Sequence, residues 1–237
     1  MAQTAAQIVQ LATQIAKCPS YLTQAGQYLN MALQSLALTN DFEVCLRRAT
    51  IVLSPSPGDG PYPLPSDYLR MQADEVQYVF GGMPVTMINV PVADLDALQK
   101  LPVTAAYPTV FSTDLSGGQG NSVLNVWGPP SGQINLDVRY FSLPPDIVTP
   151  ETSSVVPWFP FSDYLVARVA GDMMRLSGDN RAPLFLGDNP MGAEGMLRKF
   201  LSLQNDTEGR AMTVRLDPRF FGAGGGSLPP SKVYPFG

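Results

Sequence analysis

Residues 157–210 constrain the fold more than any other stretch, because they predict two helices joined by a short loop. The first helix starts at Ser162, a residue type that favours the N-cap position, and the second starts at Asn189-Pro190. Gly178 lies in the break between them. The apolar stripes are Leu165, Val169, Met173 and Leu176 in the first helix, and Met196, Phe200 and Leu203 in the second. Because each helix has one apolar face, a second layer must cover the hairpin.

The N-terminal residues predict a second helical hairpin that supplies this layer. Residues 2–17 and 21–38 each have an apolar stripe at helical spacing. Cys18-Pro19-Ser20 breaks the pattern between them, with Ser20 as the expected cap of the second helix. The polar face of the second helix is uncharged, which favours contact with a neighbouring segment over free exposure to solvent.

The residues between the two hairpins predict a β-rich module. The expected strands are residues 42–53, 75–80, 84–89, 123–127 and 133–141. Gly81-Gly82 predicts a hairpin turn, and residues 128–132 predict the turn after which the last strand returns along the one before it. Tyr68, Leu69 and Met71 predict a short helical turn or an anchor, and Leu95, Leu98 and Leu101 predict one short helix.

The expected fold class is therefore α+β, with a discontinuous helical bundle, an inserted β-rich module and an extended C-terminal segment. Residues 1–41 and 157–210 form the predicted bundle, and residues 42–156 form the insertion. Residues 211–237 form the predicted C-terminal arm, which has no helical period and contains a run of glycines.

The residue types present argue against an enzyme or a metal protein. The chain has no histidine, the commonest general base and metal ligand. Asp94 and Asp96 are close in sequence, as are Asp74 and Glu75, but neither pair has other catalytic residue types beside it. We therefore expect no catalytic residue, no cofactor and no metal. The formal net charge of -5 also disfavours a protein that grips nucleic acid through a basic face.

Cysteine usage and hydropathy favour a reducing compartment and no membrane span. Cys18 and Cys45 form no Cys-x-x-Cys motif, so we expect two small buried apolar side chains, with a disulfide as the alternative. No apolar run reaches the roughly 18 residues that a membrane helix needs. The N-terminus lacks the basic and apolar regions of a signal peptide.

Two groups of aromatic and apolar residues are candidates for contact surfaces. Trp158, Phe159 and Phe161 predict core or inter-subunit contacts, with a ligand platform as the alternative. In the C-terminal segment, apolar residues follow prolines, which keep a chain extended. This pattern favours docking in a partner's groove over a frayed terminus. The candidate docking residues are Leu228, Val233, Tyr234 and Phe236.

The order of several motifs resembles the head-to-tail adaptor (neck or connector) proteins of podovirus-like tailed bacteriophages. The motifs are YPLPSDYLR at 62–70, YPTVFSTDLSG at 107–117, VWGPPSG at 126–132, LDVRYF at 136–141, PWFPFSDYLVARVAGDMM at 157–174, GMLRKFLSLQNDTEGR at 195–210, LDPRFFG at 216–222 and LPPSKVYPFG at 228–237. They cover most of the chain. The match is weakest at residues 85–102, so no interface role is assigned there.

This resemblance implies a structural virion protein in the phage neck that is assembled in the host cytoplasm. It implies a ring of twelve copies between the portal protein and a tail or nozzle protein, with the C-terminal segment docked on the portal. DNA is expected to pass through the lumen without sequence-specific binding, which an acidic wall would favour. The alternative function is a histidine-free tail-associated enzyme, a carboxylate-based glycan hydrolase or depolymerase.

Overall fold

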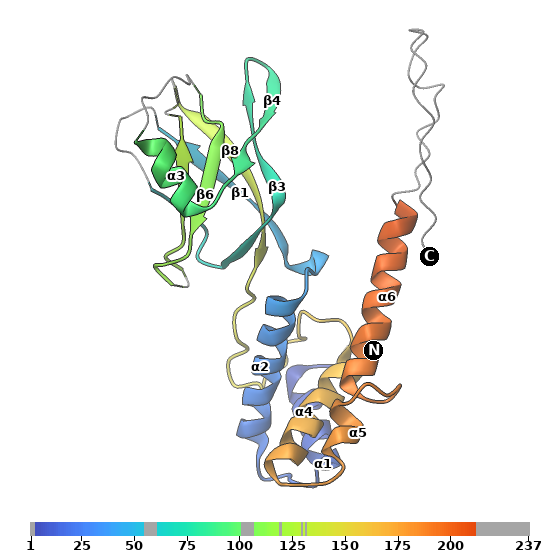
Figure 1. Ribbon diagram of the computed structural model, residues 1–237. Helices are drawn as coiled ribbons and strands as arrows, with labels where there is room; N and C mark the ends of the chain where they lie inside the picture. The colour runs from blue at the N-terminus through green and yellow to red at the C-terminus, as the bar shows by residue number, and fades with distance from the viewer. Residues whose placement is uncertain are drawn as a thin grey trace.

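The chain folds into an elongated molecule with a helical bundle at one end and a β module at the other (Figure 1). The computed structural model describes residues 3–54, 61–100, 107–118, 120–128, 130 and 132–211. The bundle contains α1 (Ala5–Ile15), α2 (Leu22–Thr39), α4 (Ser162–Leu176), α5 (Ala182–Leu186) and α6 (Ala193–Ala211). The predicted α+β class is confirmed, because helices from the N- and C-terminal parts of the chain pack together and the residues between them form two sheets.

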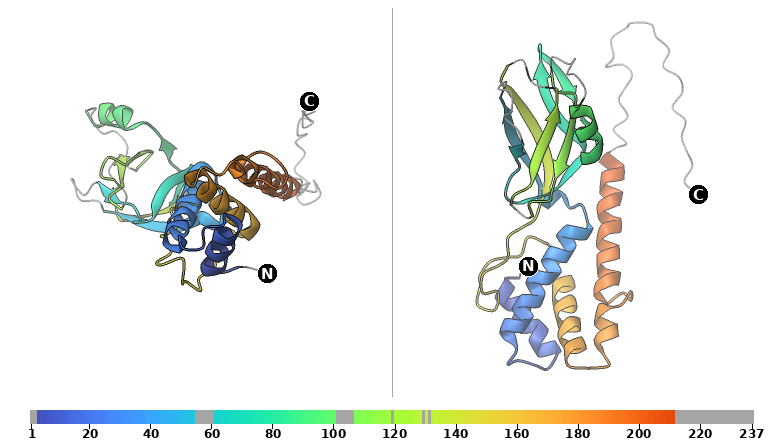
Figure 2. Two further views of the ribbon diagram at one scale, coloured as in Figure 1. Left: turned by 90° about the horizontal axis from the view of Figure 1, so that it is seen from below. Right: turned by 60° about the vertical axis from the view of Figure 1, so that its left-hand side comes forward.

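Helix α4 is the centre of the bundle. It contacts α1, α2, α5 and α6 within the bundle, which Figure 2 shows from two further sides. Its side chains are buried from Tyr164 to Met174 except for the half-buried Arg168. The predicted cap at Ser162 is wrong: Phe161 is the N-cap residue, its carbonyl accepts the first helical bond, and Ser162 is the first residue of the helix. Leu176 is also exposed, because it lies in the last turn beyond the packed region.

Helix α1 begins with a capping box that the sequence analysis missed. Thr4 Oγ1 accepts from the Gln7 amide while Gln7 Oε1 accepts from the Thr4 amide. Helix α2 has no side-chain cap, so the predicted role of Ser20 is wrong; Tyr21 occupies the N-cap position.

The hairpin predicted at residues 157–210 contains an additional short helix, α5. Helix α6 does not begin at Asn189-Pro190, because the Asn189 side chain forms a turn there: its Oδ1 accepts from Met191 N, and its Nδ2 donates to Leu184 O. Helix α6 starts at Ala193 and continues past Asn205 to Ala211.

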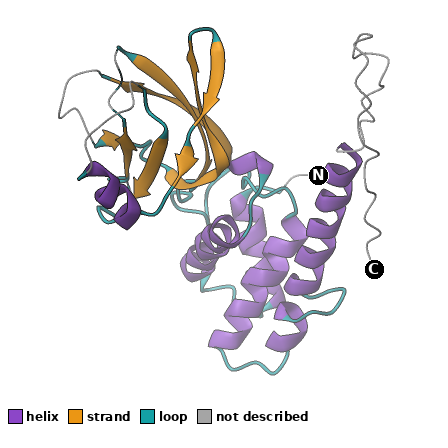
Figure 3. Ribbon diagram, turned by 45° about the horizontal axis from the view of Figure 1, so that its top comes forward, coloured by secondary structure: helices purple, strands orange, loops and turns teal. Residues whose placement is uncertain are grey.

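The β module consists of two four-stranded sheets that enclose a second core (Figure 3). One sheet has the order β1-β8-β3-β4 and the other the order β2-β7-β6-β5. The strands are β1 (Leu46–Leu53), β2 (Tyr62–Pro63), β3 (Tyr68–Phe80), β4 (Met83–Thr86), β5 (Ile88–Asn89), β6 (Val110–Asp114), β7 (Val123–Trp127) and β8 (Ile134–Ser142), with the 3-10 turn η1 (Glu43–Cys45) before β1 and α3 (Val92–Gln99) after β5. Among the described strand pairs, β5 and β6 alone run in parallel.

The predicted return of the last strand along the one before it is wrong. Strand β8 pairs with β1 and β3, whereas β7 pairs with β2 and β6, so the chain crosses between sheets after β7. Gly128 sits at this crossing with φ +94°, and a Cβ there would lie 2.6 Å from the Tyr107 carbonyl oxygen. Leu136 and Val138 on β8 then face Leu124 of the opposite sheet within one core.

Two smaller predictions for the module have different outcomes. Tyr68 and Met71 lie in the long strand β3 and not in a helical turn, since Tyr68 pairs across to Ser142. The hairpin turn at Gly81-Gly82 is confirmed, with φ values of +59° and +83°. The division of the chain into domains at residues 41, 156 and 210 stays a prediction.

Both cysteines are free thiols in the structure. Cys45 is buried and Cys18 is half-buried, and burial raises the pKa of each thiol. Among the described residues, no helix is long and apolar enough to span a bilayer.

Candidate assembly surfaces

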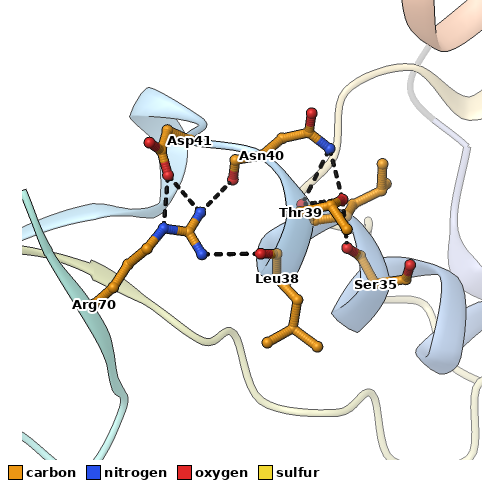
Figure 4. Close-up of polar contacts among 7 residues, drawn as sticks. Ser35, Leu38, Thr39, Asn40, Asp41 and Arg70 are labelled. Atoms are coloured by element: carbon orange, nitrogen blue, oxygen red, sulfur yellow. Dashed lines mark hydrogen bonds and ion pairs between the residues drawn. The ribbon is translucent and has the colours of Figure 1, made fainter.

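Arg70 joins the β module to the helical bundle (Figure 4). From strand β3 its Nε donates to Asp41 Oδ1 at 2.7 Å, its Nη1 to the Leu38 carbonyl at 3.1 Å and its Nη2 to the Asn40 carbonyl at 2.8 Å. These carbonyls lie at the C-terminal end of α2, where a cation is favoured by the helix dipole. The guanidinium also lies 5.3 Å from the centre of the Phe141 ring. This cluster fixes how the two parts of the molecule meet.

A second set of contacts holds the chain that returns from the β module. Asn30 of α2 exchanges two hydrogen bonds of 3.1 Å with the main chain of Ile147. Gln34, one turn further along α2, donates to Asp146 at 2.7 Å. The uncharged polar face of α2 therefore meets a neighbouring segment, as expected from its composition.

The candidate aromatic residues lie in a cluster of aromatic side chains inside the bundle. Phe159 is 2% exposed, and its ring centre lies 5.2 to 5.8 Å from those of four other rings. Those four are Phe42, Trp158, Tyr164 and Phe200. Trp158 and Phe161 are half-buried against the same core. The cluster ties the link between α2 and β1 to α6; an inter-subunit role for its half-buried members stays a prediction.

An apolar groove of about 430 Å³ lies beside α4 in the bundle. Side chains from α1, α4, α5, α6 and the loop before α6 form it, and two methionines stand at its edge. The lining residues are Ile15, Asp163, Val166, Ala167, Leu184, Phe185, Asn189, Met191 and Met196. The sequence analysis missed this surface, although the apolar run of α5 between two helices was a signal for it.

The β3–β4 hairpin forms a second exposed apolar surface at the far end of the molecule (Figure 1). Val79 and Met83 are 69% and 72% exposed. Phe80 stacks on Tyr107 with 5.3 Å between ring centres, which braces the hairpin against the module. An exposed apolar patch of this kind is typical of a contact with another protein.

A family model described as SU10 adaptor protein matches residues 3–219, nearly the whole chain. The chain belongs to the SU10 adaptor protein family. The protein is therefore a phage head-to-tail adaptor with a structural, non-enzymatic role, which confirms the resemblance seen in the sequence. No curated protein matches the chain.

Nowhere in the described part of this SU10 adaptor protein do three or more metal-ligating side chains come together. Asp94 and Asp96 are both exposed on α3. The pKa of Asp179 is lowered to about 2 because Arg181, two residues further along the same turn, donates to it from its side chain and main chain.

The sites predicted for the C-terminal segment of this adaptor lie outside the described residues. These are Leu228, Val233, Tyr234 and Phe236. The structure describes where that segment starts: helix α6 ends at Ala211, and its last described core contact is made by the half-buried Leu201.

Proposed function

We propose that this adaptor forms a ring between the portal and the tail in the virion neck, and that the DNA exit channel runs through the ring. The observation that carries the proposal is the Arg70 cluster, which holds the helical bundle and the β module in one relative orientation. A protein that bridges two components must hold them at a fixed relative position. A flexible link between its own two parts would let that position vary. The exposed β3–β4 hairpin supplies a contact surface for a neighbouring neck component.

The portal contact is assigned to the C-terminal segment. Its four apolar candidates, Leu228, Val233, Tyr234 and Phe236, lie in residues 228–237, a stretch that contains three prolines and suits an extended peptide bound in a groove. Helix α6 supports this role, because it continues to Ala211, past its last described core contact at Leu201. The ring is proposed to contain twelve copies, with a tail or nozzle protein on its other side.

The charge distribution supports passage of DNA without binding. Residues 42–156 contain five Lys and Arg and eleven Asp and Glu, a formal charge of -6, whereas the whole chain has -5. A wall with the same sign of charge as the phosphate backbone repels it and favours sliding. A ring structure with a lumen lined by Lys and Arg would contradict this part of the proposal.

The assembly test mixes the purified chain with portal protein. A ring on the portal is expected by light scattering and negative-stain microscopy. Replacing Leu228, Val233, Tyr234 and Phe236 by Ser should abolish the complex, whereas Ser231→Ala in the same segment should leave it intact. If the four-residue variant binds the portal with unchanged affinity, the segment does not dock there.

A further inference from the structure

The apolar groove beside α4 has exposed apolar side chains on its rim. Leu184 on α5 is 64% exposed and Met191 in the following loop is 79% exposed. Below them the floor is made by the buried Val166 and Ala167 of α4. Exposed apolar side chains around an apolar hollow are costly in water, and such surfaces commonly mark a binding site.

The groove is built into the fold and does not depend on an occupant to form it. At Gly171 a Cβ would lie 2.6 Å from the Leu186 side chain, so α5 packs directly on the backbone of α4. At Gly195 a Cβ would lie 2.1 Å from the Asn189 carbonyl oxygen, so the loop that carries Met191 is pressed against the start of α6. The Asn189 side chain bonds both ends of that loop, to Leu184 O and Met191 N. These contacts preorganise the walls, which lowers the cost of binding.

The chemistry of the groove suits a short apolar peptide with a positive charge. Among the described residues that line it, Asp163 at the start of α4 is the charged one, and its side chain is exposed. Methionines at the edge, Met191 and Met196, adapt to side chains of different shape. Its volume of about 430 Å³ lies within the range of sites that bury several side-chain groups.

We propose that this groove binds the C-terminal segment Ser227–Gly237 of the same chain. The segment combines Val233, Tyr234 and Phe236 with a single charged residue, Lys232. The three apolar side chains match the floor and rim of the groove, and the ammonium group matches the Asp163 carboxylate. The whole of residues 212–237 has three basic residues and one acidic residue, against a chain that is acidic overall.

The length of the chain permits this contact. Met196 lines the groove near the start of α6, and Ala211 ends the helix about 22 Å away at 1.5 Å per residue. Residues 212–233 can span up to about 70 Å when extended, more than three times that distance. Because groove and segment belong to one chain, their encounter is intramolecular and is favoured over binding a separate molecule at low concentration.

The consequence concerns when the segment is free to act. The groove and the portal would compete for the same residues, so the free chain would hold its docking segment until the portal displaces it. This consequence rests on the proposed function, whereas binding in the groove does not.

The test places a photo-crosslinker in the full-length chain without portal. The substitution is Tyr234→p-benzoylphenylalanine, whose ketone inserts readily into methionine C–H bonds. After irradiation, mass spectrometry should find crosslinks to Met191, Met196 or Phe185. A mixture of ¹⁴N- and ¹⁵N-labelled chains should give crosslinks within one isotope only. Crosslinks between isotopes would show a second copy as the occupant, and crosslinks spread over the surface would show no site; either result overturns the proposal.

A matched pair of variants separates the groove from general stickiness. Leu184→Asp adds a charge to the rim but keeps both methionine acceptors, and it should lower the crosslink yield about tenfold. Leu115→Asp changes a leucine of the β module that is also exposed, at 51%, and should leave the yield unchanged. Equal yields in the two variants would overturn the proposal.

Adding portal protein to the crosslinking reaction keeps the two proposals distinguishable. If the segment docks on the portal, the crosslinks to the groove should fall. If they persist at full yield, the groove still holds the segment and it is the portal assignment that fails.

Discussion

Arg70 of strand β3 donates to Asp41, the second residue after helix α2, with 2.7 Å between Nε and Oδ1. The Asp41 side chain is 62% exposed, so the ion pair alone contributes little. The two carbonyls that the same guanidinium bonds, those of Leu38 and Asn40, give the contact its direction. The position of the β module relative to the bundle therefore depends on main-chain geometry as well as on charge.

Replacing this arginine tests the junction. Arg70→Ala should lower the free energy of unfolding by about 1 to 3 kcal/mol, because charge-assisted bonds to main-chain carbonyls are lost together with the contact to Phe141. Arg70→Lys should restore little, since an ammonium cannot reproduce the fork of donors. Urea unfolding followed by circular dichroism measures the change.

Arg48 provides the control for this prediction. It pairs with Asp137 at 2.8 Å but its side chain is 63% exposed, so Arg48→Ala should cost less than about 1 kcal/mol. Equal losses in the two variants would show that the junction adds no more than a surface ion pair.

The cluster of aromatic side chains predicts that the stability of the bundle depends strongly on Phe159. Phe159→Ala should lower the free energy of unfolding by about 3 to 5 kcal/mol, because a buried ring with four aromatic neighbours leaves a cavity. Val148→Ala, at a position 82% exposed, should change it by no more than about 0.5 kcal/mol. A small effect of Phe159→Ala on the isolated chain would instead point to a role between subunits.

Gly195→Ala should lower the stability of the chain, although helix propensity alone predicts that it would raise it. Alanine is the better helix former by about 1 kcal/mol. A Cβ at this position, however, would meet the Asn189 carbonyl oxygen at 2.1 Å, so Gly195→Ala should destabilise the chain and displace the loop before α6. Gly132→Ala, where nothing lies within 4 Å of the added carbon, is the control. Thermal unfolding of both variants measures the effect. A raised melting temperature for Gly195→Ala would contradict the packing described.

Tyr140 predicts a loss of stability at high pH. Its hydroxyl donates to Asp67 at 2.9 Å, and burial, with the Asp67 carboxylate as acceptor, raises the pKa of Tyr140 from 10 to about 12. A raised folded pKa means that the stabilisation is complete below pH 10 and is lost as the pH rises toward 12. Tyr140→Phe should cost about 1 kcal/mol at neutral pH and should flatten the alkaline part of the profile.

The measurement is the free energy of unfolding against pH, with phenolate absorbance to follow ionisation. Some alkaline loss should remain in the variant, since burial also raises the pKa values of Tyr68, Tyr78 and Tyr164. A variant profile parallel to that of the original chain would show that Tyr140 does not drive the effect.

Local patterns were sufficient to predict most of the helices and strands. Leu165, Val169 and Met173 recur on one face of α4, and Ile134, Leu136, Val138 and Tyr140 alternate along β8, so their burial follows from helical and strand geometry. The resemblance of ordered motifs was also sufficient for the family. The apolar groove was not predictable in this way, because its walls come from residues as distant as Ile15 and Met196.

What the sequence by itself determined is most of the helices and strands, the α+β class and the absence of histidine chemistry, because each depends on residue identity or on contacts within a few positions. Only the tertiary structure decided that β7 and β8 lie in different sheets, that Arg70 caps α2, and that α5 packs on Gly171 to form the groove. These arrangements depend on which apolar faces meet across the core and on which polar groups that packing leaves within reach. Such contacts join residues far apart in the chain, and no local pattern encodes them.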